Sequence, residues 1–259
     1  MDTSKESTDI SMSRSGRPMG AGHGGHPTRR ITTGNRTRSH TGNRVDDGRV
    51  AAGQAKRAAH WDRVYRRGES ALSWYEAEPF WSLRMLDVAQ VDSSATVIDV
   101  GGGTARLVDA LLDREFFDVS VLDVSTAALG EARRRLAARA DRVHWLVADV
   151  LGWRPGRRYD VWHDRAVFHF QVEAADRASY LAVLAAGTHP GSVAVLGTFA
   201  PDGPAQCSGL PVARYDLHQL VDTLGSRWEP LVTDREQHIT PQGVTQAFTW
   251  SVVRRRPFT

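Results

Sequence analysis

The chain is poor in cysteine and lysine, two residues with distinctive chemistry. Among its 259 residues it has one cysteine, Cys207, and two lysines, Lys5 and Lys56. A single cysteine excludes a disulfide within the chain and a cysteine-based metal cluster. Beyond residue 56 there is no lysine for a Schiff base or a phosphate-binding loop. Low cysteine content is typical of a reducing compartment, so we expect a cytoplasmic protein.

Long apolar runs are also lacking. No stretch reaches the roughly 18 consecutive apolar residues that a membrane helix needs. The first 30 residues have no apolar segment of the kind found in a secretory signal. We therefore expect a soluble chain with no membrane partner.

The first 56 residues have no aromatic side chain. They contain nine glycines, and ten Lys/Arg against five Asp/Glu. Such a segment buries too little apolar surface to offset the entropy of ordering it. The sequence therefore predicts a disordered basic tail over residues 1–56, either an arm with a binding role or an extension without function. The rest, residues 57–259, has 23 basic and 25 acidic residues, so the folded domain is not expected to bind nucleic acid.

From Trp61 onward the apolar residues alternate between strand and helix patterns. Short apolar runs bounded by turn residues predict strands over 96–100, 118–123, 142–147, 159–162 and 192–197. Apolar residues at three- and four-residue spacing predict helices over 81–89, 105–112, 126–139, 175–186 and 216–224. Residues 57–90 are interpreted as an N-terminal helical lid on this domain.

The end of the chain breaks the alternation. Residues 228–236 and 246–254 are predicted to be two strands joined by a turn, with no helix between them. Five strands alternating with helices, followed by this hairpin, predict a doubly wound α/β fold. We expect a mostly parallel, seven-stranded sheet with helices on both faces and a C-terminal antiparallel hairpin.

A glycine cluster, Gly101 to Gly103, separates the first predicted strand from the next helix. In open α/β sheets ligands bind at this turn, because glycine lets the backbone approach a ligand and the helix start offers unpaired N–H groups. Glycines also serve simple tight turns. The cluster alone therefore does not define a ligand.

Three aspartates narrow the choice of ligand. Asp123 ends the second strand, 20 residues after Gly103, where a carboxylate can accept both hydroxyls of a ribose. Asp149 ends the third strand, where an acceptor would meet an adenine amino group. Asp99 precedes the glycines and suits a ligand with an ammonium group. Arg106 stands where a dinucleotide site needs its third glycine or an alanine, which argues against a diphosphate.

The segments Asp99-Val-Gly-Gly-Gly, Asp123-Val-Ser and Ala148-Asp-Val, with the terminal hairpin, resemble class I S-adenosylmethionine-dependent methyltransferases over roughly residues 57–254. The resemblance implies their Rossmann-like fold and S-adenosyl-L-methionine as cofactor. It implies that the glycines hold the methionine part, Asp123 the ribose and Asp149 the adenine. The cofactor-binding residues expected on this basis are Asp99, Gly101, Gly102, Gly103, Thr104, Asp123, Val124, Asp149 and Val150.

An aromatic group precedes the sheet and includes Trp61, Tyr65, Trp74 and Tyr75. Aromatic faces attract a sulfonium or a cationic acceptor by about 0.5–2 kcal/mol. Tyr65 is therefore a further candidate for cofactor binding. The alternative is a hydrophobic anchor that fixes the N-terminal helix to the domain.

Parts of the chain, His163 to His169 among them, are also similar to bacterial methyltransferases of unassigned substrate. They are more distantly similar to the eukaryotic protein-lysine methyltransferases of elongation factor and citrate synthase. Those lysine enzymes tend to have Asp-Lys-Gly-Thr-Phe-Asp where this chain has Asp164-Arg-Ala-Val-Phe-His169. Their closing aspartate is thus replaced by His169.

The acceptor of the methyl group is expected above the ends of the fourth and fifth strands. An oxygen or ammonium acceptor needs a base in addition to in-line positioning. Asp164 and His169 are the candidate catalytic residues, Asp164 to orient the acceptor or contact the cofactor and His169 as the base. A structural role is the alternative for His169 and for His163.

A long connection rich in glycine and proline, residues 198–215, is expected at the same edge of the sheet. Within it Arg214 and Tyr215 are candidates to bind the acceptor, whereas Cys207 is expected to be inert packing. His238 flanks the turn of the terminal hairpin, where a structural role is favoured.

These features predict an enzyme that transfers a methyl group to a small-molecule acceptor. A protein-lysine methyltransferase is the alternative within the class. A cofactor-binding scaffold or sensor without turnover is the non-enzyme alternative, because fold does not fix function. A nicotinamide dehydrogenase is less well supported, given Arg106 and the terminal hairpin. No metal is expected.

Overall fold

The computed structural model describes residues 41–68 and 71–257. The chain divides into two units, Met1–His40 and Thr41–Thr259, and the second contains the elements that follow. The disorder expected for residues 1–40 lies outside the described residues. Residues 41–56, which the sequence analysis placed in the tail, are helical and belong to α1 (Thr41–Tyr65). Asp62 of this helix accepts hydrogen bonds at the start of α4 (Thr126–Leu136), which ties the end of α1 to the domain.

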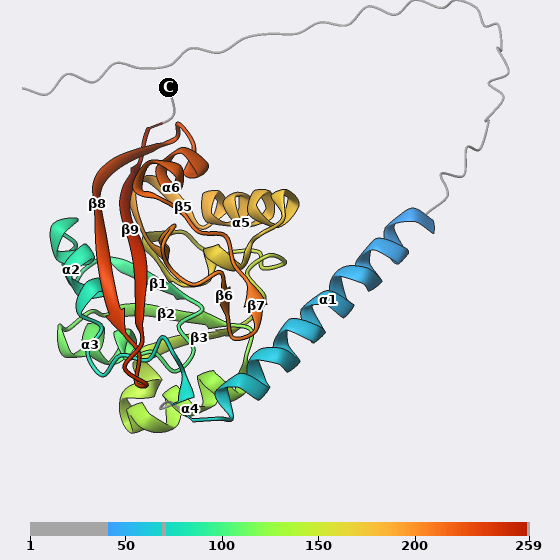
Figure 1. The fold of residues 1–259 in the computed structure, drawn as a ribbon, viewed down its shortest axis with the longest axis horizontal. Coiled ribbons are helices and arrows are strands. Elements are labelled where there is room, and N and C mark those ends of the chain that lie inside the picture. Colours follow the sequence, from blue (N-terminus) through green and yellow to red (C-terminus); the bar gives the residue numbers. More distant parts are fainter. Residues whose placement is uncertain (1–40, 69–70, 258–259) are drawn as a thin grey trace, which may run out of the picture. The chain divides into compact units, whose positions relative to one another are not determined.

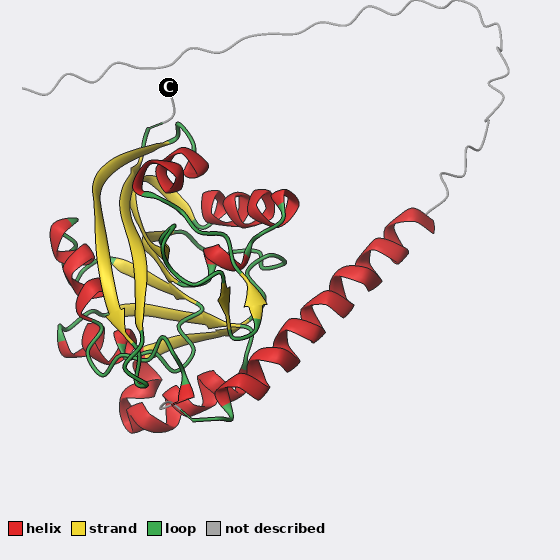
Figure 2. Ribbon diagram, in the orientation of Figure 1, coloured by secondary structure: helices red, strands yellow, loops and turns green. Residues whose placement is uncertain are grey.

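A seven-stranded sheet forms the centre of the domain (Figures 1 and 2). The strand order is β3-β2-β1-β4-β5-β9-β8, and only β9 runs antiparallel to the others. The predicted fold class and terminal hairpin are therefore confirmed. The strands are β1 (Thr96–Val100), β2 (Asp118–Asp123), β3 (Val143–Val147), β4 (Tyr159–Arg165), β5 (Thr188–Phe199), β8 (Trp228–Ile239) and β9 (Thr245–Arg255).

Helices cover both faces of the sheet (Figure 2). One apolar core lies beneath α2 (Phe80–Val88), α3 (Leu107–Asp113) and α4. The other lies beneath α5 (Ala174–Ala186) and α6 (Leu217–Leu224). None of the described helices is long and apolar enough to cross a membrane.

Successive strand residues supply the two cores in turn. Val97 of β1 and Val161 of β4 belong to the core under α2, α3 and α4. Ile98 and Trp162, the next residues along, belong to the core under α5 and α6. This alternation, which follows from the pleat of a strand, decides which polar residues of β1 and β4 reach the site described below.

The structure differs from the expected elements at several ends. The helix expected over 126–139 stops at Leu136 and continues as a 3₁₀ turn, Ala137–Arg142. Within the long connection, β6 (Gln206–Cys207) and β7 (Leu210–Pro211) form a short hairpin that the sequence did not predict. β4 extends three residues beyond the expected end at residue 162, to Arg165.

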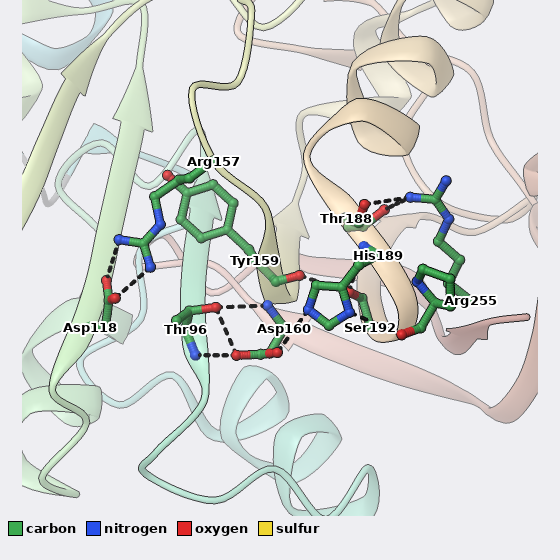
Figure 3. A network of polar contacts seen from close by, with 10 residues as sticks. Thr96, Asp118, Arg157, Tyr159, Asp160, Thr188, His189, Ser192 and Arg255 are labelled. Carbon is green, nitrogen blue, oxygen red and sulfur yellow. Dashed lines mark hydrogen bonds and ion pairs between the residues drawn. The ribbon is translucent and has the colours of Figure 1, made fainter. Parts of the chain in front are cut away.

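A polar network joins the amino ends of the parallel strands (Figure 3). Thr96 of β1 donates its backbone N–H and its hydroxyl to Asp160 of β4, each at 2.8 Å. Asp160 also lies 2.9 Å from Nε2 of His189 in β5. Asp118 of β2 pairs with Arg157, which precedes β4, at 3.0 Å. These contacts tie the starts of four strands together and leave their carboxyl ends to form a site.

Candidate active site

A cavity of about 450 Å³ lies at the carboxyl ends of the parallel strands, lined also by residues of α1. It brings together side chains that the sequence places far apart. The predicted cofactor residues that line it are Tyr65, Asp99, Gly101, Gly102, Thr104, Asp123, Val124, Asp149 and Val150. Gly103 does not line it directly but packs against Tyr65.

The glycine loop after β1 is packed too closely for side chains. A Cβ on Gly102 would lie 2.5 Å from Oδ2 of Asp99, and one on Gly103 would lie 2.1 Å from the hydroxyl of Tyr65. Gly103 also has a φ of 48°, in the left-handed region that glycine adopts readily. The loop thus lets a carboxylate and a tyrosine approach one turn of backbone.

Asp123 is a buried carboxylate at the end of β2. It accepts the backbone N–H of Ser125 at 2.7 Å, and the hydroxyl of Tyr65 lies 3.5 Å from its other oxygen. Burial raises the pKa of Asp123 to about 7; the bond from Ser125 opposes this rise and the nearby Asp99 adds to it. Further donors from a ligand would stabilise its charged form.

Each carboxylate oxygen of Asp149 has a partner. Its Oδ1 accepts the backbone N–H of Leu151 at 3.0 Å, and its Oδ2 forms an ion pair with Arg57 of α1. The same turn of α1 brings Gln54 against Gly152, where a Cβ would lie 2.0 Å from the amide nitrogen. The end of α1 is therefore part of the cavity wall, and this includes Lys56, which was predicted to belong to the tail.

This wall leads to a prediction about the N-terminus. Deletion of residues 1–40 should leave affinity for S-adenosylmethionine unchanged, whereas deletion of residues 1–60 should weaken it about tenfold or more. The longer deletion removes Lys56, Arg57 and His60 from the cavity wall. Titration calorimetry on both truncated proteins checks this. Equal affinity in the two would mean that α1 contributes nothing to binding.

Asp164 does not line the cavity, although it was a candidate catalytic residue. It follows His163 on β4 and therefore points to the opposite face. There it accepts the backbone N–H of Val167 at 2.9 Å and the hydroxyl of Tyr180 at 2.5 Å. Burial raises its pKa to about 6, against the effect of these bonds. We therefore revise the prediction: Asp164 fixes the turn after β4.

His169, the second candidate, is also away from the cavity. It lies in the 3₁₀ turn Phe168–Phe170 and is completely buried. Its ring packs against Phe170 and Phe199, with centroids 4.5 and 4.8 Å apart. Burial lowers its pKa to about 3, so the ring is neutral at physiological pH. A base needs contact with its substrate, and this geometry does not support that role.

The cavity is lined instead by residues of α2 and β4 that were not among the predicted site residues, in place of Asp164 and His169. His163 and Arg165 lie on the cavity side of β4, and Ser82 reaches it from α2. Arg165 donates to the backbone oxygen of Trp74 at 2.9 Å and to Glu76 at 2.8 Å. The signal that would have found His163 is its register, because it pairs with Asp99 on the neighbouring strand.

The remaining wall is largely aromatic. Trp61 lies 5.9 Å from Trp74 and 5.1 Å from Phe170 between ring centroids. All three line the cavity, together with Cys207 of the long connection. Burial raises the pKa of the Cys207 thiol to about 11, which keeps it protonated.

Arg214, Tyr215 and His238 do not line this cavity. Arg214 donates to the backbone oxygen of Pro201 at 2.9 Å. Nε2 of His238 lies 2.7 Å from the backbone oxygen of Ser73. Each of these two therefore has a structural partner.

Residues 97–191 match the family model described as a methyltransferase domain. The chain therefore contains a methyltransferase domain. The match covers the glycine loop, all three strand-end aspartates and β4. The fold predicted for a class I S-adenosylmethionine-dependent methyltransferase is confirmed, and the match to a methyltransferase domain is consistent with that class. No curated protein matches the chain by sequence.

Solved structures with this fold are similar to this chain over most of their own length. One, from a study of the conversion of a disulfide bond into a thioacetal group in echinomycin biosynthesis, has 21% identity and a TM-score of 0.62 over 77% of this chain and 91% of its own. The 1,6-didemethyltoxoflavin-N1-methyltransferase of Burkholderia thailandensis has 19% identity and a TM-score of 0.53, covering 69% and 82%. A methyltransferase of Anabaena variabilis has 16% identity and a TM-score of 0.59, covering 77% and 95%.

Proposed function

We propose that this methyltransferase binds S-adenosyl-L-methionine above β1, β2 and β3 and methylates a small-molecule acceptor beside β4. One observation carries the proposal: the glycine loop and the three strand-end aspartates meet in one cavity. In this proposal Asp99, Gly101, Gly102, Gly103 and Thr104 hold the methionine part. Asp123, Val124 and Tyr65 hold the ribose, and Asp149 and Val150 the adenine.

The donor set fits this cofactor. Asp99 and Asp123 are both buried beside the glycine loop, and carboxylates accept hydrogen bonds from ammonium and hydroxyl groups. Any Cβ on this loop would collide with Val167, Asp99 or Tyr65, so glycine is what lets these side chains lie against the loop. When bound, the cofactor supplies a methyl group on a positively charged sulfur. The aromatic wall of Trp61, Trp74 and Phe170 would exclude water from it.

A small acceptor is supported by the size and the lining of the cavity. About 450 Å³ must hold the cofactor and the accepting group together, and flat apolar molecules suit walls of aromatic rings. The similar structure from Burkholderia thailandensis contains 1,6-didemethyltoxoflavin with S-adenosylhomocysteine, which supports the same proposal. With one cysteine in the sequence, we place this activity in the cytoplasm.

Two measurements test the proposed function. Calorimetry with S-adenosylmethionine and with NAD should give binding of the first only. Incubation with cofactor labelled in the methyl group and a fractionated lysate should then place label in small metabolites. Label in protein would favour the protein-lysine alternative. Binding without transfer to any fraction would favour a scaffold or sensor.

The raised pKa of Asp123 predicts a pH dependence of cofactor binding. Ribose hydroxyls donate to the ionised carboxylate, and the carboxyl of the free protein is protonated below its pKa of about 7. The dissociation constant should therefore rise as pH falls through 7, by up to about tenfold per pH unit, and level off above it. Asp123→Asn should remove this dependence. Wild-type affinity that is constant across this range would contradict the assignment of Asp123 to the ribose.

A further inference from the structure

Asp99, His163 and Ser82 form a hydrogen-bonded chain on the wall of the cavity. Nδ1 of His163 lies 2.7 Å from Oδ1 of Asp99, and its Nε2 lies 2.9 Å from Oγ of Ser82. The three side chains come from β1, β4 and α2. Each is between 1 and 3% exposed, yet all three line the cavity.

Hydrogen-bond chemistry gives this chain a direction. A carboxylate only accepts, so the ring of His163 carries its proton on Nδ1. Its Nε2 is then an acceptor and takes the hydroxyl proton of Ser82. The oxygen of Ser82 keeps lone pairs that can accept from a ligand in the cavity.

The surroundings argue against a purely structural role for the hydrogen-bonded side chains of Asp99, His163 and Ser82. Around it on this face of the sheet lie apolar residues such as Val161 and Trp250, where polar side chains are costly to bury. The groups that face His163 are Asp99 from β1, Ser82 from α2 and the ring of Trp250 from β9, 6.3 Å away.

We propose that Ser82 and His163, oriented by Asp99, accept the proton that the methyl acceptor loses. This rests on the proposed function and adds a class of acceptor: a hydroxyl or ammonium group, still protonated at neutral pH, rather than a thiol that is already ionised. His163 was not the predicted base, and the predicted base, His169, does not line the cavity.

The proton and electron movements balance as follows. An ammonium acceptor first loses a proton to become an amine with a lone pair, whereas a hydroxyl has lone pairs and loses its proton as it reacts. The lone pair of the acceptor atom forms a bond to the methyl carbon, while the carbon–sulfur bond breaks and its electrons stay on sulfur. The proton of the acceptor passes to Oγ of Ser82 as the hydroxyl proton of Ser82 passes to Nε2 of His163. The imidazolium is stabilised by the carboxylate of Asp99 and returns its proton to water after the product leaves.

The test uses two simple acceptors, phenol and thiophenol, with labelled S-adenosylmethionine and the full chain at about pH 8. Thiophenol is largely ionised there and needs no base, whereas phenol does. His163→Gln should lower the rate with phenol about 10²–10⁴-fold and leave the rate with thiophenol and the cofactor affinity little changed. With the cofactor saturating at every pH, so that the titration of Asp123 does not enter, the acid limb of the phenol rate against pH should also disappear.

Two further variants complete the design. Ser82→Ala keeps the His163–Asp99 pair and should cause a smaller loss with phenol, because water can replace the hydroxyl; it also keeps the test open if His163→Gln does not fold. His144→Gln is the matched control, since His144 lies on β3 with its side chain 61% exposed, and both rates should stay at wild-type values.

The outcomes distinguish a failure of the proton relay through Ser82 and His163 from a failure of the proposed function. Equal losses with the two acceptors would show a structural role, and an unchanged phenol rate would exclude a relay. If the wild-type protein transfers the methyl group to thiophenol but not to phenol, the relay is overturned and the proposed methyl transfer stands. Failure to bind the cofactor, or to transfer to either probe when saturated with it, would overturn the proposed function itself.

Discussion

Asp123→Ala should weaken binding of S-adenosylmethionine about 100-fold. The substitution removes two hydrogen bonds from ribose hydroxyls to a charged acceptor, and bonds of this kind contribute about 1.5–3 kcal/mol each. A net loss of about 3 kcal/mol corresponds to this change in the dissociation constant. The measurement is calorimetric titration above pH 7, where the carboxyl of the wild type is ionised.

The same strand offers a matched control for this experiment. Asp118 begins β2, five residues before Asp123, and makes an exposed ion pair with Arg157 at 2.5 Å. Asp118→Ala should leave cofactor affinity unchanged. A wild-type dissociation constant for Asp123→Ala would mean that the ribose is bound elsewhere, whatever the control shows.

Asp164→Ala should lower the free energy of unfolding by about 3 kcal/mol at pH 7, while cofactor affinity stays near wild type. The change leaves the N–H groups of Val167, which is partly buried, and of Phe168, which is buried, and the hydroxyl of Tyr180 without their acceptor. Each unsatisfied donor costs about 1–3 kcal/mol, partly offset because the buried charge of Asp164 is itself unfavourable.

The effect of this substitution should depend on pH. Because the pKa of Asp164 is about 6 in the folded protein and 3.8 without the fold, its contribution to stability is fullest below the unfolded value and declines as pH rises to about 6. Denaturant unfolding should therefore give a larger loss at pH 5 than at pH 7. Tyr180→Phe, which removes one of the three donors, should give a smaller loss. Wild-type stability with lost turnover in Asp164→Ala would return this residue to the catalytic site.

The cofactor side of the site was predictable because its residues occur at the ends of strands that have clear apolar patterns. Glycines after β1 and aspartates at the ends of β2 and β3 must meet at one edge once the strands are parallel. The sequence therefore predicted Asp99, Asp123 and Asp149 as neighbours, and all three line the cavity.

The acceptor side was less predictable because it depends on the orientation of single residues. The apolar pattern ended the fourth strand at residue 162, so residues 163–165 were treated as the segment after it. In the structure β4 runs to Arg165, which imposes alternation on these residues and sends His163 and Asp164 to opposite faces. Because the predicted strand ended three residues early, Asp164 was predicted as a site residue in place of His163.

The helical part of the predicted tail was missed for a different reason. Residues 41–56 contain three of the nine tail glycines, and each glycine disfavours a helix by about 1 kcal/mol relative to alanine. The segment also has no aromatic residue to indicate packing. Lys56 lines the cavity and Gln54 packs against Gly152; both are polar side chains, which carry no periodic signal.

The network at the amino ends of the strands has a consequence for chemistry at the other end. Thr96 and Asp160 are bonded to each other in both directions, at 2.8 and 2.9 Å, and so set how far β4 slides along β1. The pairing between β4 and β5 shifts between Tyr159 and Val161, so it does not set this alignment alone. This alignment of β4 with β1 places His163 opposite Asp99, further along both strands. A slip of one residue would turn the imidazole toward Tyr180 and the carboxylate of Asp164 toward the cavity. The hydrogen bonds in Figure 3 thus fix the register of β4 and, through it, which of its side chains faces the cavity.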